Sequence, residues 1–263
     1  MFTARAGDGE RFARSAVSAG ADLVVAIGGD GTLHEVVNGV LGSKCAVGLI
    51  PFGTGNDVAR AVGLHGDLDR ACQAITNGTT TPMDVGVVTA EGLDGERHFL
   101  VLTGAGFISR TAERVNKGIR WISGAGAYVV GAILTLRDFR PFNAVVTIDD
   151  NEPIRTHAMF VCAANTSNTG GGMELAPGAD YADGLLDICI VSRVSKPELL
   201  YELGRVFKGE HVKNPAVKML RGRKVRFDAD PPQPLLIDGE VIGQTPIAVS
   251  ILPGGLTLCV PAK

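Results

Sequence analysis

The sequence has few of the features that mark secreted, membrane-spanning or nucleic-acid-binding proteins. Its 263 residues include five cysteines, with no two at C-x-x-C spacing, so neither a disulfide framework nor a zinc site is expected. The longest apolar stretch, residues 125–136, is shorter than the ~20 residues of a membrane-spanning helix. A net charge of −3 offers no broad basic surface for nucleic acid. Because residues 1–20 also lack the apolar segment of a signal peptide, we expect a cytoplasmic protein without a nucleic-acid partner.

Two common nucleotide-binding motifs are missing as well. No G-x-G-x-x-G follows a predicted strand, and the sequence contains no G-K-[ST] loop, so an oxidoreductase with a dinucleotide fold is disfavoured. Glycine is abundant, at 35 residues, but it has no fixed period and clusters between apolar runs. That distribution indicates turns and binding loops.

Residues 1–82 have the pattern of an α/β domain. A charged helix over residues 1–20 precedes the continuous apolar run 23–27, which predicts a buried parallel strand. The elements expected after it are a helix at 33–41, a strand at 46–50 and helices at 56–62 and 68–77. Alternating strands and helices predict a parallel sheet.

Residues 83–263 change to a β-rich pattern. Turn signals separate many short apolar runs, which predicts an all-β, sandwich-like domain whose last residues return to the first domain. Two helices, at 119–138 and 198–207, interrupt it. The strands are predicted at 83–89, 98–103, 144–148, 156–163, 185–191, 224–228, 235–237, 247–252 and 256–260.

The first candidate site is the loop Gly28-Gly29-Asp30-Gly31-Thr32, between a predicted strand and a helix. Ligands of open α/β sheets bind at the carboxyl ends of strands, and free amides at a helix start favour phosphate. Asp30 would repel phosphate unless a cation intervenes, so it suggests Mg²⁺ or a hydrogen bond that holds the loop. A plain turn capped by Asp30 is the alternative.

A second loop, Pro51-Phe52-Gly53-Thr54-Gly55-Asn56-Asp57, follows the next predicted strand and opens a helix. Loops at adjacent strand ends can share one ligand, and Thr54, Asn56 and Asp57 offer a hydroxyl, an amide and a carboxylate. An N-cap, which Asn56 or Asp57 could form alone, is the alternative. Two glycine loops in series favour a shared phosphate site.

A third segment, 165–187, combines Gly170-Gly171-Gly172 with three aspartates. Asp180 and Asp183 suit a hard cation such as Mg²⁺, although a hairpin turning at Asp183-Gly184 explains them equally well. Asp187 lies within a strand pattern, so a structural role is expected.

The fourth segment is Leu236-Ile237-Asp238-Gly239-Glu240. Asp-Gly is the strongest short hairpin signal, and taken alone this segment is best interpreted as a turn. In the functional interpretation, Asp238 is a general base that takes the proton of an attacking hydroxyl during phosphoryl transfer.

Together and in this order, the four segments resemble the diacylglycerol kinase catalytic-domain family, and the resemblance covers nearly the whole chain. That family includes soluble bacterial diacylglycerol kinases and, more distantly, sphingosine and ceramide kinases. The resemblance implies a phosphofructokinase-like α/β domain and a C-terminal β domain, with ATP and lipid meeting in the cleft. It implies an ATP-dependent lipid kinase.

The resemblance also assigns roles to individual residues. Asp238 matches the proposed general base and Glu240 its neighbour, while Asp30 has catalytic weight in related lipid kinases, so the base stays open between Asp30 and Asp238. Asp183, with Asp180 and the Leu185 carbonyl, matches a structural Mg²⁺ site. The ATP-contacting positions match Gly28, Gly29, Asp30, Gly31, Thr32, Gly53, Thr54, Gly55, Asn56 and Asp57.

One departure from the family pattern concerns the start of the chain. Family members begin with a strand that ends in an Asn-Pro-x-(Ser/Ala)-Gly loop, whereas this chain starts just before the helix leading to Leu23. We therefore expect a truncated α/β domain and weak binding of ATP. An NAD kinase-like phosphotransferase and a non-catalytic nucleotide- or lipid-binding protein are the alternative functions.

A lipid substrate requires contact with a membrane surface, so we looked for an apolar face. Residues 120–137 could form a peripheral, non-spanning contact, although a core helix covering the β domain explains the same pattern better. A homodimer is compatible with the sequence. The residues of this face are Arg120, Trp121, Ile122, Tyr128, Val129, Val130, Ile133, Leu134 and Arg137.

Overall fold

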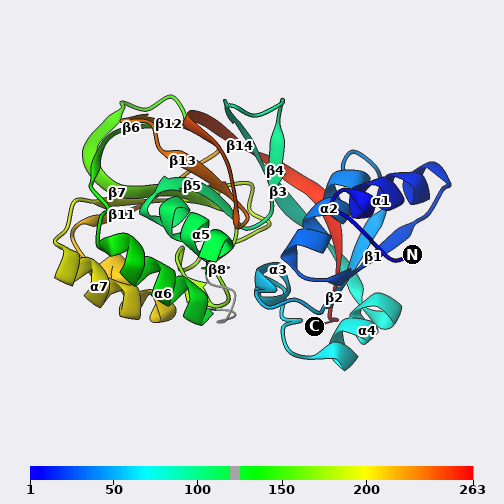
Figure 1. Cartoon of the computed structure of the whole chain (residues 1–263). Helices are drawn as coiled ribbons and strands as arrows, with labels where there is room; N and C mark the ends of the chain where they lie inside the picture. Colours follow the sequence, from blue (N-terminus) through cyan, green and yellow to red (C-terminus); the bar gives the residue numbers. More distant parts are fainter. Residues whose placement is uncertain (119–124, 263) are drawn as a thin grey trace.

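The computed structural model describes residues 1–118 and 125–262 and has an α/β part beside a larger β-rich part (Figure 1). In the α/β part, β1 and β2 pair in parallel, with Leu23 opposite Ala46 and Gly28 opposite Pro51. The predicted fold class, α/β followed by a β-rich domain, is confirmed. The elements of the first part are α1 (Asp8–Ser18), β1 (Leu23–Gly28), α2 (Asp30–Val40), β2 (Ala46–Pro51), α3 (Asp57–Ala61) and α4 (Leu68–Asn77).

Strand β1 is parallel, as predicted, but the prediction that it is buried is wrong for one of its faces. Ala26 is buried, but Ile27 is 63% exposed, and Leu23 and Val25 are each 37% exposed. Among the described strands β1 pairs with β2 alone. Helix α4 covers this face at β2, where a Cβ on Gly48 would meet Ile75, but it leaves the same face of β1 open.

The β-rich part continues the same sheet. Its order runs β1-β2-β14-β12-β6-β7-β10-β11, and β3, β4, β5 and β13 pair off this path. The strands are β3 (Thr79–Glu91), β4 (Arg97–Phe99), β5 (Leu102–Gly106), β6 (Phe142–Ile148), β7 (Ile154–Ala164), β8 (Asn168–Thr169), β9 (Met173–Glu174), β10 (Leu186–Ser192), β11 (Val217–Gly222), β12 (Lys224–Asp230), β13 (Pro234–Ile237) and β14 (Glu240–Val260).

Strand β14 joins the two parts. It pairs with β12, β13 and β3, and at Leu258 it lies beside Val47 of β2. Two separate strands were predicted here, because Pro253-Gly254-Gly255 has the composition of a turn. The structure accommodates these residues as a shift of register within one strand. The domain boundary expected at residue 82 falls inside β3, which pairs with β14 along both parts.

Three helices lie along one side of the β-rich part (Figure 1). They are α5 (Phe107–Gly118), α6 (Ala125–Leu136) and α7 (Lys196–Arg205), and 3₁₀ turns at Val206–Lys208 and Glu210–Lys213 follow α7. The predicted helix 119–138 overlaps α6, and residues 119–124 lie outside the described residues. Helix α5 and strand β11 were not predicted.

The carboxylate of Asp84 ties three distant segments together. It is 2% exposed and lies in β3, where its Oδ2 accepts a hydrogen bond from Gly184 N at 2.6 Å and its Oδ1 accepts one from Gly254 N at 2.7 Å. Removing a buried acceptor leaves its N–H donors without a hydrogen-bond partner, which costs free energy. This contact therefore holds the segment before β10 and the irregular part of β14 against β3.

We predict that Asp84→Ala lowers the free energy of unfolding by about 2–5 kcal/mol, because two buried N–H groups lose their acceptor. Urea denaturation followed by circular dichroism measures the change. Thr89→Ala, at an exposed position of the same strand, is the control and should stay within ~0.5 kcal/mol of wild type. Equal stability of the Asp84 variant and the control would contradict the proposed tie.

Candidate active site

The structure brings the two predicted glycine loops together at the carboxyl ends of β1 and β2. Phe52 N donates a hydrogen bond to Gly28 O at 2.8 Å. A Cβ on Gly29 would lie 3.1 Å from the Cα of Gly53, and a Cβ on Gly53 would overlap Gly29. Only glycine at both positions allows this approach. The two loops therefore form one backbone-lined surface.

Asp30 fixes the relative position of the loops. Its Oδ1 accepts a hydrogen bond from Asp57 N at 2.8 Å, which joins the first turn of α2 to the first turn of α3. Gly55 packs on the same carboxylate, since a Cβ there would lie 2.8 Å from Oδ2. Thr32 folds back over Gly28, where a Cβ would meet its hydroxyl at 2.5 Å.

The simple N-cap interpretation of the second loop does not hold. Asn56 precedes α3 in the left-handed conformation, with φ 51°, and its side chain makes no cap hydrogen bond. Its amide instead bonds back to Gly53, accepting from the backbone N–H at 3.0 Å and donating to the carbonyl at 2.6 Å. Asn56 therefore shapes the loop, and the Asp30 carboxylate, rather than Asn56, accepts the first amide of α3.

The triple-glycine segment also reaches this site. Gly170, Gly171 and Gly172 all have positive φ, a conformation that favours glycine. Gly171 N donates to Asp57 Oδ1 at 3.0 Å, although the two residues lie 114 positions apart. Burial and the nearby Asp30 carboxylate raise the pKa of Asp57 to about 6, and burial also raises the pKa of Asp30.

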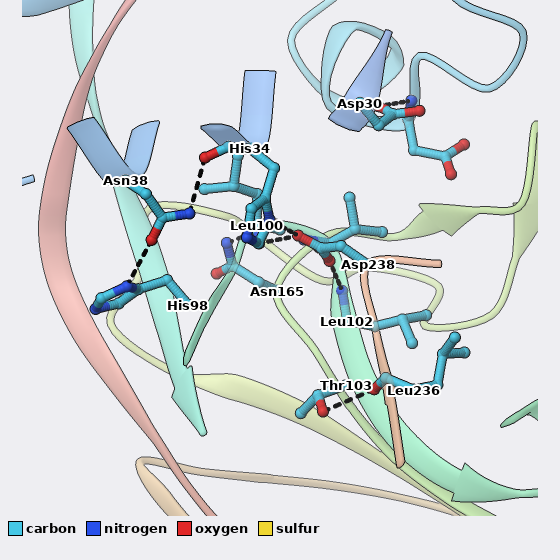
Figure 2. A network of polar contacts seen from close by, with 12 residues as sticks. Asp30, His34, Asn38, His98, Leu100, Leu102, Thr103, Asn165, Leu236 and Asp238 are labelled. Atoms are coloured by element: carbon cyan, nitrogen blue, oxygen red, sulfur yellow. Dashed lines mark hydrogen bonds and ion pairs between the residues drawn. The ribbon is translucent and has the colours of Figure 1, made fainter. Parts of the chain in front are cut away.

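Asp238 lies in a tight hairpin turn, and its carboxylate is buried. Ile237 pairs with Glu240, and Asp238 and Gly239 have φ of 43° and 90°, as expected for the two central residues of a tight hairpin. The Asp238 side chain is 8% exposed. Its Oδ2 accepts from Leu100 N at 2.6 Å, and its Oδ1 accepts from Val101 N at 2.9 Å and Leu102 N at 3.0 Å (Figure 2).

These three amides explain why the predicted strand 98–103 is split. The chain leaves the ladder between β4 and β5, and the amides of residues 100 and 101 point at a carboxylate more than 130 positions away. Asp238 N donates back to Leu102 O at 3.0 Å. Glu240 begins β14 beside this turn with an exposed side chain.

His34 belongs to the site and was missed in the sequence. Its Nδ1 lies 3.5 Å from Asp238 Oδ2 (Figure 2). Burial lowers the pKa of His34, but Asp238 and Glu240 outweigh it, so the pKa is raised overall. The available signal was its spacing: His34 lies four residues after Asp30 and hence on the same face of α2.

A chain of contacts continues from His34 to β4. Asn38 Nδ2 donates to His34 O at 2.9 Å, and Asn38 Oδ1 lies 2.9 Å from His98 Nδ1 (Figure 2). This chain attaches helix α2 to the β-rich part beside Asp238. The helix that carries the first glycine loop is therefore held against the Asp238 hairpin.

The residues of the predicted structural Mg²⁺ site do not fit a metal ion in this arrangement. The Asp183 carboxylate pairs with the Arg221 guanidinium and accepts from Leu185 N at 3.0 Å. Asp180 accepts from Ala182 N at 3.0 Å. Over residues 1–118 and 125–262, no group of three or more His, Cys, Asp or Glu side chains could hold a metal ion. The Arg221 guanidinium, and not a Mg²⁺ ion, therefore lies beside Asp183.

An apolar cavity of about 120 Å³ opens beside the site. Gly170 and Gly239, from the third and fourth loops, form part of its wall, and helices α5, α6 and α7 form much of the rest. Its deeper polar members are Glu202, His211 and Asn214. Most of its lining is apolar and includes Leu102, Phe107, Ala132, Leu136, Phe160, Met173, Leu199 and Leu203.

We predict that Asp57→Asn makes the protein more stable at neutral pH. The wild-type carboxyl keeps its proton to about pH 6 when folded, whereas an unfolded Asp has the ordinary value of 3.8, so its contribution to stability is lost as pH rises between these values. Asparagine accepts the same Gly171 hydrogen bond and carries no charge.

Urea denaturation at pH 4.5 and pH 7.5 should show the stability of Asp57→Asn, relative to wild type, rising by about 2 kcal/mol between the two pH values. Asp150→Asn, at an exposed position, is the control and should show no such rise. A constant difference between wild type and Asp57→Asn would contradict the raised pKa.

Comparisons with known proteins identify the family to which the chain belongs. The model of the diacylglycerol kinase catalytic domain matches residues 1–88, and that of the YegS C-terminal NAD kinase beta sandwich-like domain matches residues 102–260. A diacylglycerol kinase of Mycobacterium tuberculosis is 31% identical over 97% of this chain and 82% of its own length. One from Bacillus subtilis is 29% identical over 93% of this chain and 79% of its own length.

A solved structure supports the same fold. The crystal structure of a diacylglycerol kinase from Bacillus anthracis superposes with a TM-score of 0.76 and 23% identity, covering 99% of this chain and 84% of that one. None of the described helices has the length and apolar character needed to cross a membrane. With the four loops converging on one site and both family models matching in order, the chain belongs to the diacylglycerol kinase catalytic-domain family.

Proposed function

We propose that this protein transfers the γ-phosphoryl group of ATP to a hydroxyl of a lipid such as diacylglycerol. The observation that carries the proposal is the apolar cavity whose wall includes Gly170 and Gly239, residues of the same loops that contact Asp57 and present Asp238. A phosphate-binding surface and an apolar cavity at one site suit an acceptor with an apolar tail and a polar end.

The joined glycine loops supply the nucleotide side of this proposal. Residues 28–32 and 53–57 form a backbone-lined surface at the start of α2, where free amides and the helix dipole favour phosphate, whereas the first amide of α3 is bonded to Asp30. The paired carboxylates Asp30 and Asp57 would repel the phosphates of free ATP, but they favour Mg²⁺-bound ATP, the form that kinases use. Burial first, and the neighbouring Asp30 carboxylate second, raise the pKa of Asp57, so a bound cation would favour its ionised form.

The cavity supplies the lipid side. Its volume of about 120 Å³ is below the ~300–1,000 Å³ of typical ligand sites, so an acyl chain requires its lining to open. Met173, with its flexible side chain, lies in the lining close to the Gly170 turn and can move without breaking a polar contact. Leu199 and Leu203 of α7 form another part of the wall.

Asp238 supplies the negative charge for proton removal from the acceptor hydroxyl. Its carboxylate is held by three backbone amides beside the cavity wall, and Glu240 lies two residues further along the chain. Phosphoryl transfer needs little more than positioning, charge neutralisation and such a group. Asp30 then acts on the nucleotide side, through the loops that it joins.

The acceptor is drawn from a membrane surface in this proposal. On α6, Ile133 is 49% exposed and Leu134 is 47% exposed, whereas Ala127 and Ala132 are buried against the β-rich part. One side of the helix is therefore available for a peripheral contact. Trp121 and Ile122, the other apolar residues expected there, lie outside the described residues.

Phosphate transfer from radiolabelled ATP to a panel of lipid alcohols in mixed micelles tests the function. We expect label in diacylglycerol, and a fall in kcat of at least ~10²-fold in Asp238→Asn. NAD, in place of the lipid, tests the NAD kinase-like alternative. Lipid binding without any transfer would point to a non-catalytic binding protein, and unchanged turnover of Asp238→Asn would contradict the role of Asp238.

A second prediction concerns the cavity. Ala132→Phe fills space in its wall and should raise KM for long-chain diacylglycerol by about 10-fold, while KM for ATP stays unchanged. Ala19→Phe, at the exposed residue that follows helix α1, is the matched control. Circular dichroism verifies that both variants fold. Equal KM values for long-chain lipid in wild type and Ala132→Phe would contradict a lipid site in the cavity.

A further inference from the structure

We infer that His34 takes the proton from the acceptor hydroxyl and that Asp238 acts through it, as an orienting carboxylate. This inference rests on the proposed lipid kinase function and names the atom that performs one step of it. It follows from how the lone pairs of Asp238 are used.

The carboxylate of Asp238 has no acceptor site to spare for a substrate. An ionised carboxylate offers about four lone-pair positions. Val101 N and Leu102 N occupy two of them on Oδ1, Leu100 N occupies one on Oδ2, and His34 Nδ1 faces the remaining one at 3.5 Å. The side chain is also 8% exposed. A lipid hydroxyl would have to displace an amide or His34 to reach it.

His34, by contrast, presents a free nitrogen. Its side chain is 27% exposed. Among the described residues no hydrogen bond is made to Nε2, and the buried side-chain atoms that lack a partner are Arg60 Nε, Asn165 Oδ1 and His211 Nδ1. Nε2 is therefore open to solvent, while Nδ1 faces Asp238 (Figure 2). A carboxylate on one ring nitrogen fixes the tautomer whose other nitrogen accepts a proton.

The position of His34 suits this step. It lies one helical turn beyond Asp30 on the same face of α2, between the nucleotide loops and the Asp238 hairpin. Gly239, the neighbour of Asp238, forms part of the cavity wall. His34 itself does not line the cavity, so the inference requires the acceptor hydroxyl to project past Gly239 towards Nε2.

The chemical step balances with ATP and a lipid alcohol alone. The hydroxyl oxygen bonds to the γ-phosphorus, and the bond from that phosphorus to the bridging oxygen breaks with its electron pair leaving on ADP. The hydroxyl proton moves to Nε2 and passes to water when the products leave. The charge on the imidazolium is balanced by Asp238 and Glu240, while Arg97 and His98 of β4 oppose it.

Steady-state kinetics of the full chain from pH 5.5 to pH 8.5 test the assignment. His34→Gln should lower kcat by ~10²–10⁴-fold, leave KM for ATP and diacylglycerol unchanged, and remove the fall of kcat towards acid pH. The control, His157→Gln, alters an exposed histidine of β7 and should match wild type. If His34→Gln keeps a near-wild-type kcat, and kcat still falls towards acid pH, the inference is overturned. Asp238 would then be the group that takes the proton.

A second measurement does not depend on turnover. NMR titration of the His34 ring, assigned by its loss in His34→Gln, should show a pKa that falls when Asp238 is replaced by Asn, because the carboxylate no longer stabilises the imidazolium. A His34 pKa that is the same in wild type and in Asp238→Asn would overturn the inferred pairing of His34 with Asp238. If wild type phosphorylates no lipid alcohol, the lipid kinase function fails, and this titration still decides whether Asp238 governs His34.

Discussion

The site depends on the hydrogen bond from the Asp57 amide to the Asp30 carboxylate, together with the glycine contact beneath it. This bond fixes two helix starts side by side, and it can form only because Gly29 and Gly53 allow the loops to approach. Asp57 then accepts from Gly171, which brings the β-rich part into the site. The two hydrogen bonds, at the carboxyl ends of β1 and β2, thus set the position of three loops.

The close approach of Asp30 and Asp57 has an electrostatic cost that the proposed function would explain. Two carboxyls sit close together and largely out of water, and the pKa values of both are raised. An arrangement selected for stability alone would avoid this repulsion. Perturbed carboxyls in a loop-lined site are typical of functional centres, and in the proposed function a cation-bound nucleotide would relieve the repulsion. Asp238 differs, because three backbone amides donate to its carboxylate and His34 faces the remaining acceptor position.

Much of this could be predicted from local sequence. Loops Gly28–Thr32 and Pro51–Asp57 follow adjacent parallel strands, so geometry requires their ends to meet. Asp238-Gly239 is a hairpin signal and forms one. The exposed face of β1 was not predictable from an apolar run, because composition does not tell which face a helix covers. The continuity of β14 through Pro253-Gly254-Gly255 depends on β3, which pairs with it on both sides of the irregularity.

The missed features all arise from contacts between distant segments. His34 becomes significant only when a hairpin some two hundred residues later places Asp238 beside it, and the cavity exists only when α7 packs near α6. The predicted Mg²⁺ site was wrong because Arg221 pairs with Asp183, and no local sequence pattern connects these two residues. For His34 and for Asp183, the pairing of charges between distant segments decided which groups lie together.

The central claim is that the loops from both parts of the chain form one nucleotide-binding surface. Amide hydrogen exchange with and without a non-hydrolysable Mg²⁺-ATP analogue tests it most directly. The account predicts that the analogue slows exchange together in segments 28–32, 53–57 and 170–172, with one concentration dependence. Protection confined to a single loop, or none in segment 170–172, would contradict it.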